Sequence, residues 1–344
     1  MKRLYNKALM YQFFYLGKWA LFVSMIFYGI FTYGFVNSNL ANLSLNISVL
    51  EGDTLDNLNP YHIIFLCLII FLLYVVVTGF NKRNNMTFLT SGPYTKEEIK
   101  KNEILFLIIS LLLLIFTFIY INICLYVRDN TLLLLASNEY TALFSNIMRL
   151  VIVGTAFIAY LTFMDMLFSN TIISILAMIG TPVILAVNLL LLNDIANRLN
   201  SFHLYNFNLV RDISHIMSSM INFIFGSKII YESIDYIAII ILLMIIVVTF
   251  IITWRINKSL CLNKINNFFV FPIVEKIVFF IISFTISLVF IYLICYKYTY
   301  YYNYNTTTSV KGTIITLTLI SICVAVSYVI KNLLSKLFKD LINK

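Results

Sequence analysis

The chain has 344 residues, of which 61% are hydrophobic and 11% are charged, and its formal net charge is +9. A soluble globular chain has about 25% charged residues, so this composition excludes a water-soluble fold and requires the bilayer as solvent. The lysines and arginines cluster in short segments between apolar runs, which is a membrane-orientation pattern and argues against a nucleic-acid partner.

The predicted fold is all-α: a polytopic helical membrane protein with about eight transmembrane helices, forming a single transmembrane domain over residues 1–344. A membrane-spanning helix needs about 20 predominantly apolar residues. In chain order, the stretches that meet this criterion are residues 19–36, 61–80, 104–126, 150–168, 172–192, 236–254, 277–296 and 312–330.

Two further predictions concern the first span and the pair formed by the fourth and fifth spans. The run that begins at Trp19 has no small-residue cleavage site after it, so we expect an uncleaved first span. The fourth and fifth runs are separated only by residues 169–171. Together they are much longer than one bilayer crossing, so we expect a tight helical hairpin there.

Basic residues predict the orientation of the chain. With the N-terminus inside, most of the 24 lysines and arginines fall in inner segments, and the first outer loop, residues 37–60, contains none. This asymmetry predicts that both termini lie on the cytoplasmic side, N-in and C-in. The inner residues are Lys2, Arg3, Lys7, Lys18, Lys82, Arg83, Lys96, Lys100, Lys101, Arg255, Lys258, Lys264, Lys276, Lys331, Lys336, Lys339 and Lys344.

Three amphipathic segments flank the spans, and one of them, residues 208–226, lies on the outer side with apolar residues at helical spacing. Residues 2–18 combine basic and aromatic side chains, and residues 331–344 form a predicted cytoplasmic tail with leucines and Phe338 on one face. Helices of this kind lie in the membrane interface.

Motifs for chemistry are scarce. The sequence has no phosphate-binding loop, no H-E-x-x-H and no G-x-S-x-G, so we predict no catalytic, cofactor-binding or metal-binding residues and no enzyme activity in this chain. Charges inside membrane spans are costly and are functional candidates. Asp165, near the inner end of the fourth span, is therefore a candidate functional carboxylate, and the shortage of such charges argues against an ion-coupled transporter.

The inner loop of residues 81–103 is the most informative stretch. Gly92-Pro93 is a turn signal, and Thr95 with Glu98 has the spacing of a capping box, which predicts a helix start. A short capped helix at the inner surface is suited to act as a lever between the spans and a cytosolic partner. The alternative is an ordinary helix start with solvated charges.

This loop resembles a known family. Residues 88–99, FLTSGPYTKEEI, are similar to the loop after the second span of bacterial ABC-2-type transporter permeases, which meets the ATPase subunit. The second basic inner loop, residues 257–271, resembles a further stretch of that family at Lys258 and Phe271. It departs from the family at Leu260, Asn263 and Asn266, where Arg, Glu and Gly are usual.

The resemblance implies a permease subunit of an ATP-driven exporter in the cell membrane. ATP would be used by a separate ABC ATP-binding subunit, a second permease subunit would complete the transporter, and membrane lipids would surround it. The implied ATPase-coupling residues are Pro93, Tyr94, Thr95, Glu97, Glu98 and Lys101, with Lys258 and Lys264 in a second coupling loop.

Other functions stay open from the sequence. A non-catalytic membrane receptor or immunity protein would bind a ligand through its outer segments. A secondary transporter or channel would need buried charges or a polar pathway within the spans.

Overall fold

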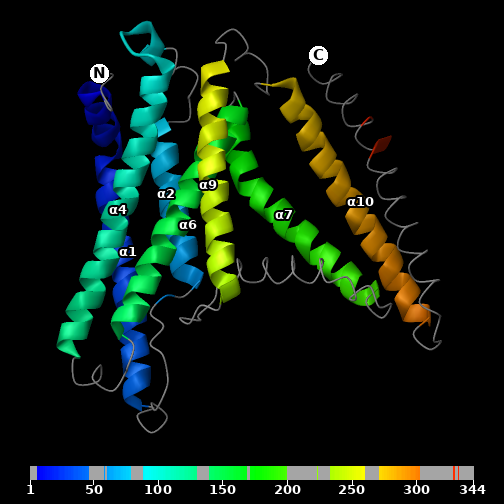
Figure 1. Ribbon diagram of the computed structural model, residues 1–344, viewed down its shortest axis with the longest axis horizontal. Helices are drawn as coiled ribbons and strands as arrows, with labels where there is room; N and C mark the ends of the chain where they lie inside the picture. The colour runs from blue at the N-terminus through cyan, green and yellow to red at the C-terminus, as the bar shows by residue number, and fades with distance from the viewer. Residues whose placement is uncertain are drawn as a thin grey trace. The chain divides into compact units, whose positions relative to one another are not determined.

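A computed structural model of the chain describes residues 6–45, 58, 60–78, 88–129, 139–168, 171–199, 223, 233–259, 271–302, 328–329 and 332. Long α-helices account for most of these residues (Figure 1). They are α1 (Lys7–Leu45), α2 (Pro60–Thr78), α4 (Lys96–Arg128), α6 (Glu139–Leu167), α7 (Thr171–Leu199), α9 (Ser233–Ser259) and α10 (Pro272–Tyr302).

Six of the described helices are long and apolar enough to cross a membrane: α1, α2, α4, α6, α9 and α10. In α7 the apolar segment is shorter, Ile172–Asn188. The prediction of a helical, multi-pass membrane protein is therefore confirmed, while the number of eight spans and the N-in, C-in orientation stay predictions. The predicted span at 312–330 and the tail at 331–344 lie outside the described residues, apart from Tyr328, Val329 and Asn332.

The helices fall into two compact units. Unit 1 contains α1, α2, α4, α6 and α9, and unit 2 contains α7 and α10, which pack against each other. In unit 1, α4 is the central element, because it contacts α1 most extensively and also contacts α2 and α9. Gly154 of α6 lies against the side chain of Leu111 on α4, so α6 joins the same bundle.

Several contacts place five helix ends together at one end of unit 1. The Asn6 backbone N–H donates to Asn102 Oδ1 at 3.2 Å, which joins the starts of α1 and α4. Gly17 of α1 lies beside Phe106 of α4 and Val77 of α2. The charged end, as we call it, comprises Asn6, residues 7–18 of α1, 74–78 of α2, 96–106 of α4, 162–166 of α6 and 251–259 of α9.

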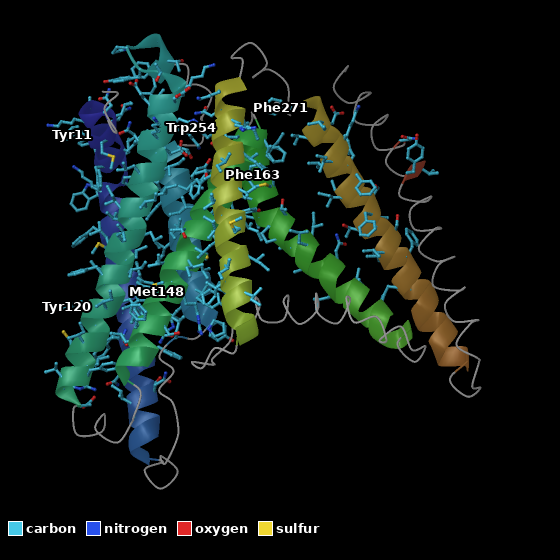
Figure 2. The ribbon with its side chains drawn as sticks, viewed as in Figure 1. Tyr11, Tyr120, Met148, Phe163, Trp254 and Phe271 are labelled. Carbon is cyan, nitrogen blue, oxygen red and sulfur yellow. The ribbon has the colours of Figure 1, made fainter. Side chains whose placement is uncertain are left out.

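The opposite end of unit 1 is closed by other contacts. Arg128 Nη2 at the end of α4 donates to Asn37 Oδ1 of α1 at 2.6 Å. A buried apolar cluster of Val36, Leu40, Leu125 and Tyr126 lies nearby, with Leu143 of α6 packed against it. Figure 2 shows Tyr11 and Trp254 toward the charged end, and Tyr120 and Met148 toward the opposite one. Successive helices α1, α2, α4 and α6 therefore alternate in direction.

Two local predictions can be compared with the helix bounds. Helix α6 ends at Leu167 and α7 begins at Thr171, so the fourth and fifth apolar runs form two separate helices, while the expected tight hairpin between them stays a prediction. Residues 7–18, in contrast, do not form a separate surface segment, because α1 continues through them into the first apolar run. The physical reason is that no Pro interrupts this stretch, and Leu9, Met10 and Phe13 are buried in the bundle.

Candidate functional site

The capped start of α4 matches the sequence prediction. Thr95 has an extended backbone, its Oγ1 accepts from the Glu98 N–H at 3.3 Å, and the Thr95 N–H donates to Glu98 Oε2 at 3.0 Å. The capping box satisfies two of the backbone donors that a helix start leaves unpaired. Residues 88–95 are therefore joined to a helix whose first turn is fixed in place.

The segment before the cap is a surface element. Phe88 is 74% exposed, and Ser91, Gly92, Pro93 and Thr95 are also exposed. Leu89 is buried, and the Ser91 hydroxyl donates to the Phe88 carbonyl at 2.7 Å, so one helical turn precedes Gly92. The segment thus offers an exposed phenyl ring and a proline outside the apolar part of the bundle.

Replacing Thr95 with alanine tests the cap. We expect the Thr95→Ala variant to lose about 1 kcal/mol of stability, because the Glu98 N–H loses its acceptor. Denaturant titration in mixed micelles measures this change. The Thr95→Ser variant keeps a hydroxyl acceptor and should match the wild type, and an equal loss in both variants would contradict the role of the cap.

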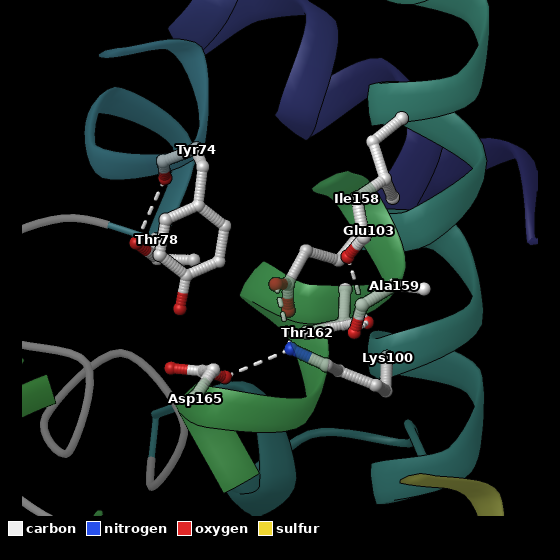
Figure 3. Close-up of polar contacts among 8 residues, drawn as sticks. All are labelled: Tyr74, Thr78, Lys100, Glu103, Ile158, Ala159, Thr162 and Asp165. Carbon is white, nitrogen blue, oxygen red and sulfur yellow. Dashed lines mark hydrogen bonds and ion pairs between the residues drawn. The ribbon is translucent and has the colours of Figure 1, made fainter. Parts of the chain in front are cut away.

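Just inside this surface lies a buried ion network. Lys100 Nζ of α4 is 2.7 Å from Glu103 Oε1 and 2.8 Å from Asp165 Oδ2 of α6 (Figure 3). Lys100 is 1% exposed, and Glu103 and Asp165 are also buried. The carboxylate singled out from the sequence, Asp165, therefore joins the start of α4 to the end of α6.

Helix α2 completes the surroundings of this network. The Tyr74 ring lies 6.0 Å from Lys100 Nζ, and Figure 3 shows the Tyr74 hydroxyl facing Asp165. Two carboxylates share one ammonium, so the three charged groups sum to −1 when all are ionised. A buried, hydrogen-bonded ion network specifies one packing of its helices, and it becomes costly when one partner is removed.

The structure corrects one expectation from the sequence. The sequence assigns Lys100 to the basic inner loop of residues 81–103, where solvated charges are one of two interpretations, and it shows few charges inside the predicted spans. Instead Lys100, Glu103 and Asp165 are buried together, and Arg149 of α6 is buried elsewhere, 5.8 Å from the Phe223 ring. The reason is that α2 and α6 cover the first turns of α4, which local sequence does not reveal.

One lysine from each of the two predicted coupling loops lies near the same tryptophan ring. Lys101 Nζ of α4 lies 4.6 Å from the centroid of the Trp254 ring on α9, and Lys258 Nζ lies 5.9 Å from the same ring. Tyr94, Glu97, Glu98 and Lys101 are half-buried, whereas Lys258 is exposed. Lys264 lies outside the described residues.

The described residues contain no group of three or more His, Cys, Asp or Glu side chains that could hold a metal ion. The charged end combines an exposed turn, a capped helix start and a buried ionic link between helices. No family model, curated protein or solved structure matches this chain.

Proposed function

We propose that this chain is the membrane-embedded permease subunit of an ATP-driven ABC exporter in the cell membrane. In this proposal, residues 88–98 contact a separate ATP-binding subunit on the cytoplasmic side. The observation that carries the proposal is the exposed turn at Phe88–Pro93, followed at once by the capped start of the central helix α4. The resemblance of residues 88–99 to the ATPase-contacting loop of ABC-2-type permeases adds to it.

The length of α4 supports a lever role. Its 33 residues correspond to about 50 Å at 1.5 Å per residue. The hydrocarbon core is about 30 Å thick, so this helix extends beyond it. A force applied at residues 88–98 therefore acts on the projecting end of α4 rather than on a separate loop.

The buried network supports transmission of that force. Lys100 lies one turn beyond the cap and is held by Asp165 on α6, while Asn102 is held by the start of α1. A displacement of the α4 start therefore moves α6 with it, because breaking the ion pair would leave a buried charge unpaired, and the Asn102 hydrogen bond links α1 to the same start. ATP-driven closure of two ATPase subunits would tilt these helices and move a substrate outward.

The test is co-purification from native membranes in mild detergent. We expect the tagged chain to capture, in stoichiometric amount, a protein whose sequence carries a phosphate-binding loop and which hydrolyses ATP. The double variant Phe88→Ser, Glu97→Arg should reduce this capture about tenfold or more, because it removes the exposed ring and reverses a charge at the docking segment. Quantitative mass spectrometry of the purified complex measures the ratio.

The control must leave the helix cap intact. Glu98 accepts the Thr95 N–H, so a charge reversal there would disturb the fold as well as the docking surface. The Glu98→Gln variant retains an acceptor and should capture the ATPase as the wild type does. Undiminished capture by the double variant, or no ATPase with the well-folded wild type, would contradict the proposal; the second result would favour a ligand-binding receptor or immunity protein.

A further inference from the structure

Trp254 is the centre of a basic cluster at the charged end of unit 1. The ammonium groups of Lys101 and Lys258 come from different helices and both lie within 6.0 Å of its ring centroid, the range of cation–π attraction. Arg255 follows Trp254 directly and is exposed. Two positive groups from different helices thus lie around one indole ring.

Among the described residues, the lysines of this cluster differ from Lys100 and Arg128 in having no carboxylate partner. Lys100 contacts two carboxylates and Arg128 contacts Asp129. Within the described part of the chain, neither Lys101 nor Lys258 has a carboxylate within 4.0 Å. An uncompensated pair of ammonium groups favours an anion that approaches both.

The position of the cluster on α9 indicates what kind of anion. Exposed apolar side chains run along this helix at Met244, Val248 and Ile251, with spacings of four and three residues. The same stripe continues into exposed Arg255 and Lys258. An apolar stripe that ends in basic residues beside a tryptophan is the pattern of a helix leaving the hydrocarbon for the headgroup layer.

A further polar group lies at the same helix end. Asn257 is 3% exposed, and its side-chain amide has no hydrogen-bond partner among the described residues. It is three residues beyond Trp254 and therefore lies beside it on α9, whereas the side chain of the next residue, Lys258, points about 100° away from it around the helix. Its amide N–H₂ is a donor suited to a phosphate oxygen.

We propose that Lys101, Trp254 and Lys258 form a binding site for the phosphate of an anionic lipid headgroup. The inference does not depend on the proposed transport function, and it assigns Lys101 to lipid binding instead of ATPase contact. The phosphate would lie between the two ammonium groups, with Arg255 at the rim. Basic sites between membrane helices at the cytoplasmic surface recognise anionic headgroups in this way.

Tryptophan fluorescence can report on this site, because the chain contains only two tryptophans, Trp19 and Trp254. The Trp19→Phe variant, reconstituted in phosphatidylcholine vesicles, leaves Trp254 as the sole fluorophore. We expect brominated phosphatidylglycerol to quench Trp254 at mole fractions about fivefold lower than brominated phosphatidylcholine, the preference that one basic side chain near the surface provides.

Two variants test the role of the lysines. In the Trp19→Phe background, Lys101→Gln with Lys258→Gln should reduce the preference, and Lys101→Arg with Lys258→Arg should retain it, because the charges remain. The Trp254→Phe variant reports on Trp19, which has a single lysine, Lys18, at 5.9 Å, and should show a smaller preference.

Three results would overturn the proposal. One is equal quenching of Trp254 by the two brominated lipids. Another is a preference that the glutamine substitutions do not reduce, in protein that elutes as a folded species. The third is a shift of Trp254 emission by inorganic phosphate in detergent, at ionic strength matched with chloride, without selective quenching by the anionic lipid, which would assign the site to a free anion.

Discussion

Replacing Lys100 with methionine is expected to destabilise the protein by about 3–5 kcal/mol, the largest effect of any single substitution considered. Methionine fills a similar volume, so the packing around α4 changes little. The variant leaves the buried carboxylates of Glu103 and Asp165 next to each other without their shared ammonium. Denaturant titration in mixed micelles measures the loss in the free energy of unfolding.

Companion variants separate charge from packing in this experiment. Lys18→Met removes an exposed lysine that lies over the Tyr15 ring and should change stability by less than about 0.5 kcal/mol. Adding Glu103→Gln and Asp165→Asn to Lys100→Met removes the unpaired charges and should restore most of the loss. If Lys100→Met were as mild as Lys18→Met, the buried network would not be a structural link between α4 and α6.

Replacing Gly154 with alanine is expected to cost about 1–3 kcal/mol through overpacking. A Cβ at this position of α6 would overlap the δ carbons of Leu111 on α4, so the two helices approach closely because position 154 has no side chain. Small residues allow such close contacts between helices in membranes. Thermal unfolding followed by size-exclusion chromatography in detergent measures the change.

Gly34 gives a matched control on α1. A Cβ there would have no atom within 4 Å, so Gly34→Ala should stabilise its helix by about 0.5–1 kcal/mol. Leu111→Ala removes the atoms that Gly154→Ala meets, so the double variant should lose less than the sum of the two single losses. Additive losses would mean that α4 and α6 do not touch at Gly154.

The membrane helices could be predicted because their signal is local. Twenty apolar residues in a row suffice to predict a span, and the breaks between them coincide with polar or basic residues. The start of α4 was predictable for the same reason, since Thr95 and Glu98 are three residues apart. The helices are apolar on all sides, however, so the sequence does not indicate which face meets another helix and which meets lipid.

The buried network could not be predicted without the tertiary structure, although the sequence of α4 contains part of the signal. Lys100 and Glu103 continue, at spacings of three and four residues, the row of buried positions Leu107, Leu111, Leu114 and Phe118. Charges that extend a buried row of this kind are candidates for burial. Their partner Asp165 lies 65 residues from Lys100, and only the packing of α6 brings them together.

The ion network also has a consequence for how the protein is assembled during synthesis. At 5–20 residues per second, Asp165 is made about 3 to 13 s after Lys100, which is 65 residues earlier in the chain. In that interval Lys100 and Glu103, one helical turn apart, neutralise each other within α4. When Asp165 enters the bilayer, its partner Lys100 is already present in α4. Stable insertion of α6 therefore depends on the earlier insertion of α4.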